Sequence, residues 1–227
     1  MSTNLHSALT EILAMPYFKN EHAQSGGAKY GHEDAVALRI KSAGFTEFSK
    51  SKFKALSKSL LKEWADSDDD TLLQQVLANL PAGSYIAQPA GSQGFPDILV
   101  KDFCGRFVAV ECKSGKNGQT PMWNDNVPKQ KAIYVLSSGK LNATTVFLGR
   151  DVITQAQYDI MAQQEKEIEQ VVAKYALLME QADSLKRGFL QKSRKQHFQM
   201  GGGRKTNYFK HADRIKCEQN VLDYANQ

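Results

Sequence analysis

Long apolar runs are missing from this sequence. No stretch approaches the roughly 18 consecutive apolar residues that indicate a membrane-spanning helix. The segment from Met1 to Phe18 has no basic start, and Glu11 interrupts its apolar residues, so we do not expect a secretory signal. We therefore expect a cytoplasmic protein that has no membrane partner.

Cysteine is scarce as well. The chain has three, Cys104, Cys112 and Cys217. An odd number at wide spacing matches neither a disulfide framework nor a zinc site. Since cytoplasmic thiols stay reduced, we expect all three cysteines to be free.

Internal repeats are also absent, and 41% of the residues are hydrophobic, which is enough to build a core. The 227 residues suit a single domain, 1–227. Within it we expect a helical N-terminal part (1–82), a sheet core that carries the chemistry (83–150) and a helical, basic C-terminal part (151–227).

Acidic residues are nearly absent from one segment. Between Lys186 and Lys216 the sequence has ten lysines and arginines and one acid, Asp213, a net charge of +9. The rest of the chain carries −4, since the whole carries +5. Positive charge concentrated in one segment is typical of a surface that binds nucleic-acid phosphates.

Apolar spacing predicts the secondary structure. Residues at helical spacing, with stops such as Pro16 and Gly44, predict helices over 5–13, 31–43, 53–64 and 71–80, and helical structure in one or two pieces over 151–196. Short apolar runs between turn residues predict strands over 85–87, 97–100, 107–110, 132–136 and 144–148. These runs are almost continuously apolar, so we expect an α/β fold with a central mixed sheet covered by helices on both faces.

Three polar residues lie at the ends of two predicted neighbouring strands. Asp97 opens the first strand, and Glu111 and Lys113 lie near the end of the next, with Gly105 in the turn between them. A hairpin of this length can place Asp97 beside Glu111. Residues two apart on a strand share a face, so Glu111 and Lys113 point the same way, and Cys112 points to the opposite face.

This trio suits phosphodiester hydrolysis. Magnesium prefers oxygen ligands and is commonly held by one or two carboxylates, which Asp97 and Glu111 can supply. A lysine such as Lys113 can orient the attacking water or stabilise charge on the phosphate. The alternative is a surface hairpin with a cross-strand ion pair, but Val108, Ala109 and Val110 leave no polar alternation on that strand.

The pattern Pro96-Asp97 followed by Glu111-x-Lys113 resembles the signature of the PD-(D/E)xK nucleases. The flanking segments 88–93 and 123–129 resemble those of some type II restriction endonucleases. The resemblance covers about residues 84–150. It implies a restriction-endonuclease-like fold, hydrolysis of double-stranded DNA to 5′-phosphate and 3′-hydroxyl ends, and a Mg²⁺ cofactor.

The resemblance also implies a set of ligands. Asp97, Glu111 and the backbone carbonyl of Cys112 would bind the metal. Many members carry a further acid on a helix before the sheet, and Glu33 is the candidate here. Glu33 borders the apolar face formed by Ala37 and Ile40, although an acid in a first helical turn is also favoured by the helix dipole alone.

One connection departs from the family pattern. Where the family core has a helix after the Glu-x-Lys strand, the segment 114–130 contains two glycines and two prolines and shows little helical periodicity. We interpret it as a loop near DNA. Its candidate DNA-contacting residues are Lys116, Asn117, Gln119 and Asn124.

The C-terminal part offers further DNA contacts. Three glycines, 201–203, precede a stretch that combines cations, an amide and aromatics. Glycines permit close approach to phosphates, arginine can bind guanine and asparagine can bind adenine. The candidates are Arg204, Lys205, Asn207, Tyr208 and Lys210, and the alternative is a solvated basic tail.

The sequence therefore predicts a type II restriction endonuclease that cleaves a short specific sequence. Two alternatives stay open: a repair nuclease or junction resolvase of the same fold, and a non-catalytic DNA-binding protein. The predicted helical stretch 151–196 is either core packing or a homodimer interface, since cleavage of both strands of a palindrome favours two-fold symmetry.

Overall fold

The computed structural model describes residues 3–17, 31–53, 56–67, 69–91, 94–115, 120–121, 123–124, 127–186, 196–197 and 207–227. None of the helices formed by these residues is long and apolar enough to cross a membrane.

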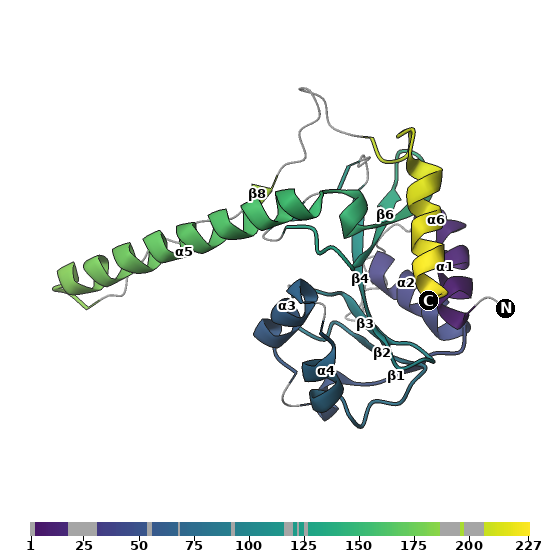
Figure 1. Ribbon diagram of the computed structural model, residues 1–227, viewed down its shortest axis with the longest axis horizontal. Helices are drawn as coiled ribbons and strands as arrows, with labels where there is room; N and C mark the ends of the chain where they lie inside the picture. Colours follow the sequence, from purple (N-terminus) through teal and green to yellow (C-terminus); the bar gives the residue numbers. More distant parts are fainter. Residues whose placement is uncertain are drawn as a thin grey trace, which may run out of the picture.

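A mixed sheet of six strands forms the centre of the molecule (Figure 1). Its order is β1-β2-β3-β4-β6-β7, with β1 parallel to β2, β4 parallel to β6, and the other neighbours antiparallel. The strands are β1 (Thr46–Glu47), β2 (Ser84–Ala87), β3 (Ile98–Lys101), β4 (Phe107–Gly115), β6 (Ile133–Ser138) and β7 (Ala143–Leu148). A separate antiparallel pair joins β5 (Trp123–Asn124) to β8 (Gln196–His197).

Helices cover both faces of this sheet. One face packs against α1 (Asn4–Leu13), α2 (His32–Ser42) and α6 (Arg214–Ala225), and the other against α3 (Lys58–Asp66) and α4 (Thr71–Val76). Alternation along β4 explains both cores, because Val108 and Val110 join the first and Phe107 and Ala109 join the second. The expected α/β architecture with a doubly covered mixed sheet is thus confirmed.

The helix α5 (Gln155–Ala182) projects away from this body (Figure 1). Its 28 residues span about 42 Å. Thr154 caps its start, since its hydroxyl accepts from the backbone N–H of Gln157 at 3.2 Å. Tyr158 is the one residue of this helix that is buried, and apolar side chains further along it, such as Tyr175 and Leu178, are exposed.

Two short 3₁₀ turns complete the described elements: Lys50–Lys52 and Gly149–Asp151. Gly149 packs directly on the chain that leads into β6. A Cβ atom at this position would lie 1.9 Å from the backbone oxygen of Lys129, so glycine is needed for the close approach.

Several sequence-based boundaries need correction, and one is that α4 ends at Val76 instead of residue 80. The third helix begins at Lys58 instead of residue 53, because Ser57 supplies an N-cap by accepting from the N–H of Leu60. The strand predicted over 107–110 continues to Gly115 because β6 pairs with it beyond Val110. Two further corrections concern helices in the C-terminal part of the chain. The long helix ends at Ala182, before an Asp-Ser pair that disfavours helix interiors, and α6 was not predicted.

Candidate active site

The sheet opens between β3 and β4 at the position of the candidate residues. β3 pairs with β4 only as far as Ile98 opposite Val110. From Glu111 to Gly115, β4 pairs with β6 on its other side. The register places Asp97, which immediately precedes β3, opposite Glu111.

The structure brings Asp97, Glu111 and Lys113 together. The backbone N–H of Asp97 donates to Oε2 of Glu111 at 3.2 Å. Lys113 Nζ lies 2.6 Å from Oε1 of the same carboxylate, as two residues on one face of a strand permit. The predicted hairpin and the shared face of Glu111 and Lys113 are both observed.

Two carboxylates in this position repel each other. Burial and the charges of Glu111 and Glu33 together raise the pKa of Asp97 to about 7, against the opposing effects of the Cys112 N–H and the Lys113 charge. Burial also raises the pKa of Glu111, while Lys113 counteracts that increase. The site therefore carries unfavourable negative charge that a bound cation would relieve.

Glu33 lies near enough to Asp97 and Glu111 for its charge to act on both, without forming a three-residue metal-binding group with them in the described residues. It lies in the first turn of α2, and its charge raises the pKa of both Asp97 and Glu111. Its Oε2 accepts a hydrogen bond from Nε2 of Gln88 at 3.2 Å. A first-turn acid that served only the helix dipole would not need this contact with the sheet end.

Gln88 is a positioning residue that the sequence analysis did not single out. It follows β2 with a φ of 46°, in the left-handed region that is uncommon for a side chain other than glycine. Its backbone N–H donates to the carbonyl of Asp97 at 2.6 Å, and its side chain binds Glu33. The sequence feature that could have pointed to Gln88 was its position at the start of the segment 88–93, directly before a proline.

Cys112 contributes its backbone to the site. Its N–H donates to Oδ2 of Asp97 at 2.7 Å. The N–H and C=O of one strand residue point to the same side, so the Cys112 carbonyl also faces the Asp97 side. The thiol packs against the first core, as predicted, and burial raises its pKa well above the usual range.

The donor set fits a hard cation such as Mg²⁺. Within the described residues, no group of three or more His, Cys, Asp and Glu side chains is arranged to hold a metal ion. Mg²⁺ does not require such a group, because it is usually held by one or two carboxylates, with water and phosphate oxygens as its other ligands. The oxygens of Asp97 and Glu111 and the Cys112 carbonyl meet that requirement.

The predicted DNA-contacting residues are only partly within the described chain. Lys116, Asn117, Gln119, Arg204 and Lys205 lie outside it, as does the side chain of Asn124. The remaining three lie just before α6. Lys210 is exposed, Asn207 Oδ1 accepts from the N–H of Phe209 at 3.0 Å, and the Tyr208 ring lies 4.6 Å from that of Phe147.

One strand pair joins the two predicted DNA-contact regions. β5 lies in the connection after β4, and β8 lies in the basic segment 186–216. Their pairing places Trp123 opposite His197 and Asn124 opposite Gln196. The two regions are far apart in the sequence, and in the described residues β5 and β8 bring part of each side by side.

Comparisons of this chain with protein-family models, with curated proteins and with solved structures found no match.

Proposed function

We propose that this protein is a Mg²⁺-dependent endonuclease of the PD-(D/E)xK kind, with a restriction-endonuclease-like sheet, that cleaves double-stranded DNA at a short specific sequence. The observation that carries the proposal is the convergence of Asp97, Glu111 and Lys113 where β4 separates from β3. A protein that only bound DNA would not need two crowded, half-buried carboxylates beside a lysine.

Each residue of the trio has a distinct part in the proposed reaction. Asp97 and Glu111, with the Cys112 carbonyl, would hold the cation. Bound Mg²⁺ neutralises charge on the scissile phosphate and lowers the pKa of water. Lys113 carries a positive charge on the same face as Glu111. It would orient the attacking water and stabilise the charge that develops on the phosphate in the transition state.

Glu33 and Gln88 would help to position Asp97 and to attract the cation. The Gln88 backbone holds the carbonyl of Asp97, while its side chain holds the Glu33 carboxylate. Glu33 adds negative charge near both metal ligands, which favours the retention of a divalent cation.

Cleavage of plasmid DNA tests the proposal. With Mg²⁺ we expect discrete fragments that are identical in repeated digests, and we expect none in excess EDTA. Calcium should support DNA binding without cleavage, because its coordination is larger and looser. A matched control is Asp159→Asn, which removes an exposed carboxylate on α5 and should leave the fragments unchanged.

The choice of DNA substrate separates the alternatives. Cleavage of a four-way junction without cleavage of ordinary linear duplex would indicate a junction resolvase that uses the same residues, instead of a sequence-specific endonuclease. Full cleavage in EDTA would contradict a metal-dependent mechanism. Tight DNA binding with no cleavage of any substrate in Mg²⁺ would favour the non-catalytic alternative.

A further inference from the structure

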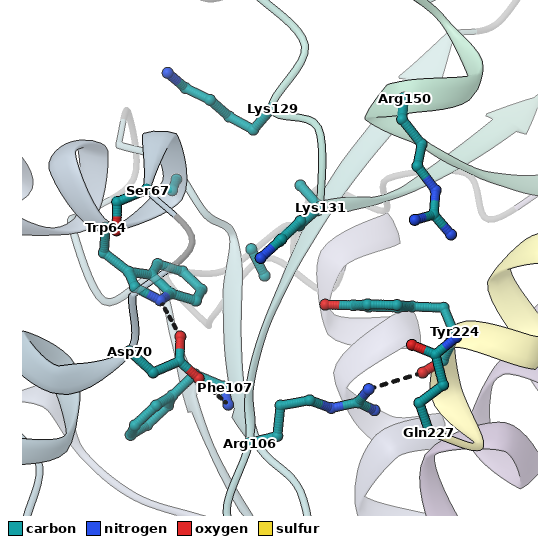
Figure 2. A pocket seen from close by; sticks show the side chains of 13 residues that line it. Trp64, Ser67, Asp70, Arg106, Phe107, Lys129, Lys131, Arg150, Tyr224 and Gln227 are labelled. Carbon is teal, nitrogen blue, oxygen red and sulfur yellow. Dashed lines mark hydrogen bonds between the residues drawn. The ribbon is translucent and has the colours of Figure 1, made fainter. Parts of the chain in front are cut away.

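A cavity of about 370 Å³ lies beside the first residues of β4 (Figure 2). Its walls come from α3 and the loop after it, the start of β4, the chain before β6, the 3₁₀ turn after β7 and the end of α6. This volume falls in the range of small-molecule sites. The proposed nuclease chemistry assigns no role to it.

Positive charge dominates the walls of this cavity. Arg106, Lys131 and Arg150 extend toward it from three different segments (Figure 2). Lys129 contributes its stem, and its Nζ lies 3.3 Å from the hydroxyl of Tyr158 on α5. Lys131 and Arg150 are exposed, so neither side chain is needed by the core.

Asp70 is the one acidic side chain among the residues that line the cavity. Its Oδ1 accepts from Trp64 Nε1 at 2.7 Å, and its Oδ2 accepts from the backbone N–H of Phe107 at 3.4 Å. Both carboxylate oxygens of Asp70 thus accept from neutral donors, and these hydrogen bonds link Asp70 to α3 and to the start of β4. Arg106, Lys131 and Arg150 face two carboxylates, Asp70 and the Arg106 partner Asp102, which leaves one positive charge in excess.

Within the part of the chain that the structure describes, two of the three guanidinium nitrogens of Arg106 form hydrogen bonds, and the third does not. Nε binds Oδ2 of Asp102 at 3.0 Å, Nη1 donates to the carbonyl of Tyr224 at 2.9 Å, and the guanidinium carbon lies 4.8 Å from the centre of the Tyr224 ring. Nη2 is buried and has no hydrogen-bond partner among the described residues. Because Nη2 is closed off from the cavity, Arg106 would act on a bound anion through its charge rather than through this nitrogen.

Tyr224 lies close enough to Arg106, Lys131 and Arg150 for their charges to act on its hydroxyl. Burial raises the pKa of its hydroxyl, and the charges of Arg106, Lys131 and Arg150 all oppose that increase. Figure 2 shows its hydroxyl directed toward the space bounded by Lys131 and Trp64. The site therefore combines converging cations with two aromatic rings, those of Trp64 and Tyr224.

We propose that this cavity binds a phosphate-bearing anion through Arg106, Lys131 and Arg150. Guanidinium groups match the geometry of phosphate oxygens, and aromatic rings beside them suit a nucleobase. Two sources can supply the phosphate, a free nucleotide or a nucleic-acid strand. A nucleic-acid strand fits the geometry, since it could reach from the cavity to the proposed active site. Ala109, on the cavity wall, shares a face of β4 with Glu111, about 7 Å further along.

Calorimetric titration with inorganic phosphate and with adenosine 5′-monophosphate, in EDTA at low ionic strength, tests the free-ligand source. We expect saturable binding by the wild-type protein. The double variant Lys131→Gln/Arg150→Gln should weaken it by about tenfold or more, since two charge-assisted hydrogen bonds are lost. The control Lys41→Gln/Lys140→Gln removes the same charge from exposed positions on α2 and in the β6–β7 turn, and should keep wild-type affinity.

Titration with a short DNA duplex, in the presence of calcium, tests the other source. A loss of DNA affinity in the cavity variant but not in the control, without binding of either small probe, would assign the phosphate to the DNA strand. The proposal is overturned if no probe binds, or if the two double variants lose affinity equally with every probe. Neither result depends on cleavage, so failure of the nuclease proposal would be seen separately.

Discussion

Lys113→Ala is expected to lower the rate of DNA cleavage by on the order of 10²–10³-fold, because it removes the positive charge placed to stabilise the transition state. Lys113 Nζ lies 2.6 Å from Glu111, so its removal also leaves that carboxylate without its cation. The change is outside the two cores, and folding should be preserved. The measurement is the single-turnover rate of plasmid cleavage in Mg²⁺.

Changes to the two carboxylates should have effects at least as large. Glu111→Gln and Asp97→Asn keep the shape of the side chains but remove the charges that would hold Mg²⁺. DNA binding in calcium separates loss of chemistry from loss of binding. Lys140→Ala, on an exposed turn, is the control for loss of one positive charge. Cleavage by Lys113→Ala at a rate near that of the wild type would remove this residue from the mechanism.

Asp97→Asn is expected to make the protein more stable in EDTA at pH 8, by about 1–3 kcal/mol, although it removes activity. The pKa of Asp97 in the folded protein is about 7, against an ordinary value of 3.8. Because Asp97 is partly exposed, solvent screening keeps the gain below about 4 kcal/mol, the value that corresponds to the full change in pKa. The amide oxygen that this substitution introduces would still accept the Cys112 N–H.

The sign of this effect depends on pH. Between about pH 4 and 7 the folded protein holds a proton on Asp97 that the unfolded chain has released, so wild-type stability falls as pH rises through this window. The variant lacks that decline, and the two proteins should be close in stability near pH 4. Urea denaturation in EDTA at several pH values measures the difference.

Mg²⁺ provides a second measurement on the same pair of proteins. Adding it at pH 8 should stabilise the wild type and have little effect on Asp97→Asn, because a ligand that binds only the folded state adds stability. Asp159→Asn, which changes an exposed acid on α5, should behave as the wild type throughout. An Asp97→Asn variant that is less stable than the wild type at pH 8 would show that the carboxylates do not repel each other as described.

The sheet and the positions of its chemical groups were largely predictable from sequence. Five of its strands are short apolar runs between turn residues, and Gly105, with a φ of +85°, lies in the turn that joins β3 to β4 as predicted. The two-residue spacing of Glu111 and Lys113 fixed their common face. These features depend on local periodicity, which a single sequence contains.

The remaining features depend on contacts between distant segments. β1 has two residues and exists because it pairs with β2, and β5 exists because it pairs with β8, about 70 residues later. The link from Gln88 to Glu33 spans 55 residues and required the folded chain. α6 begins within the basic segment that we interpreted as a DNA-contacting tail, and Val221 and Ala225 attach it to the first core.

The projecting helix α5 implies that the molecule opens locally as well as globally. Its residues as far as Glu169 line a pocket with Lys62 and Val127, whereas apolar side chains further along, such as Tyr175 and Leu178, are exposed. Amide protons in its last turns can therefore exchange with solvent through fraying from the Ala182 end. Those of β4 and β6, whose side chains fill both cores, exchange only when the sheet itself unfolds.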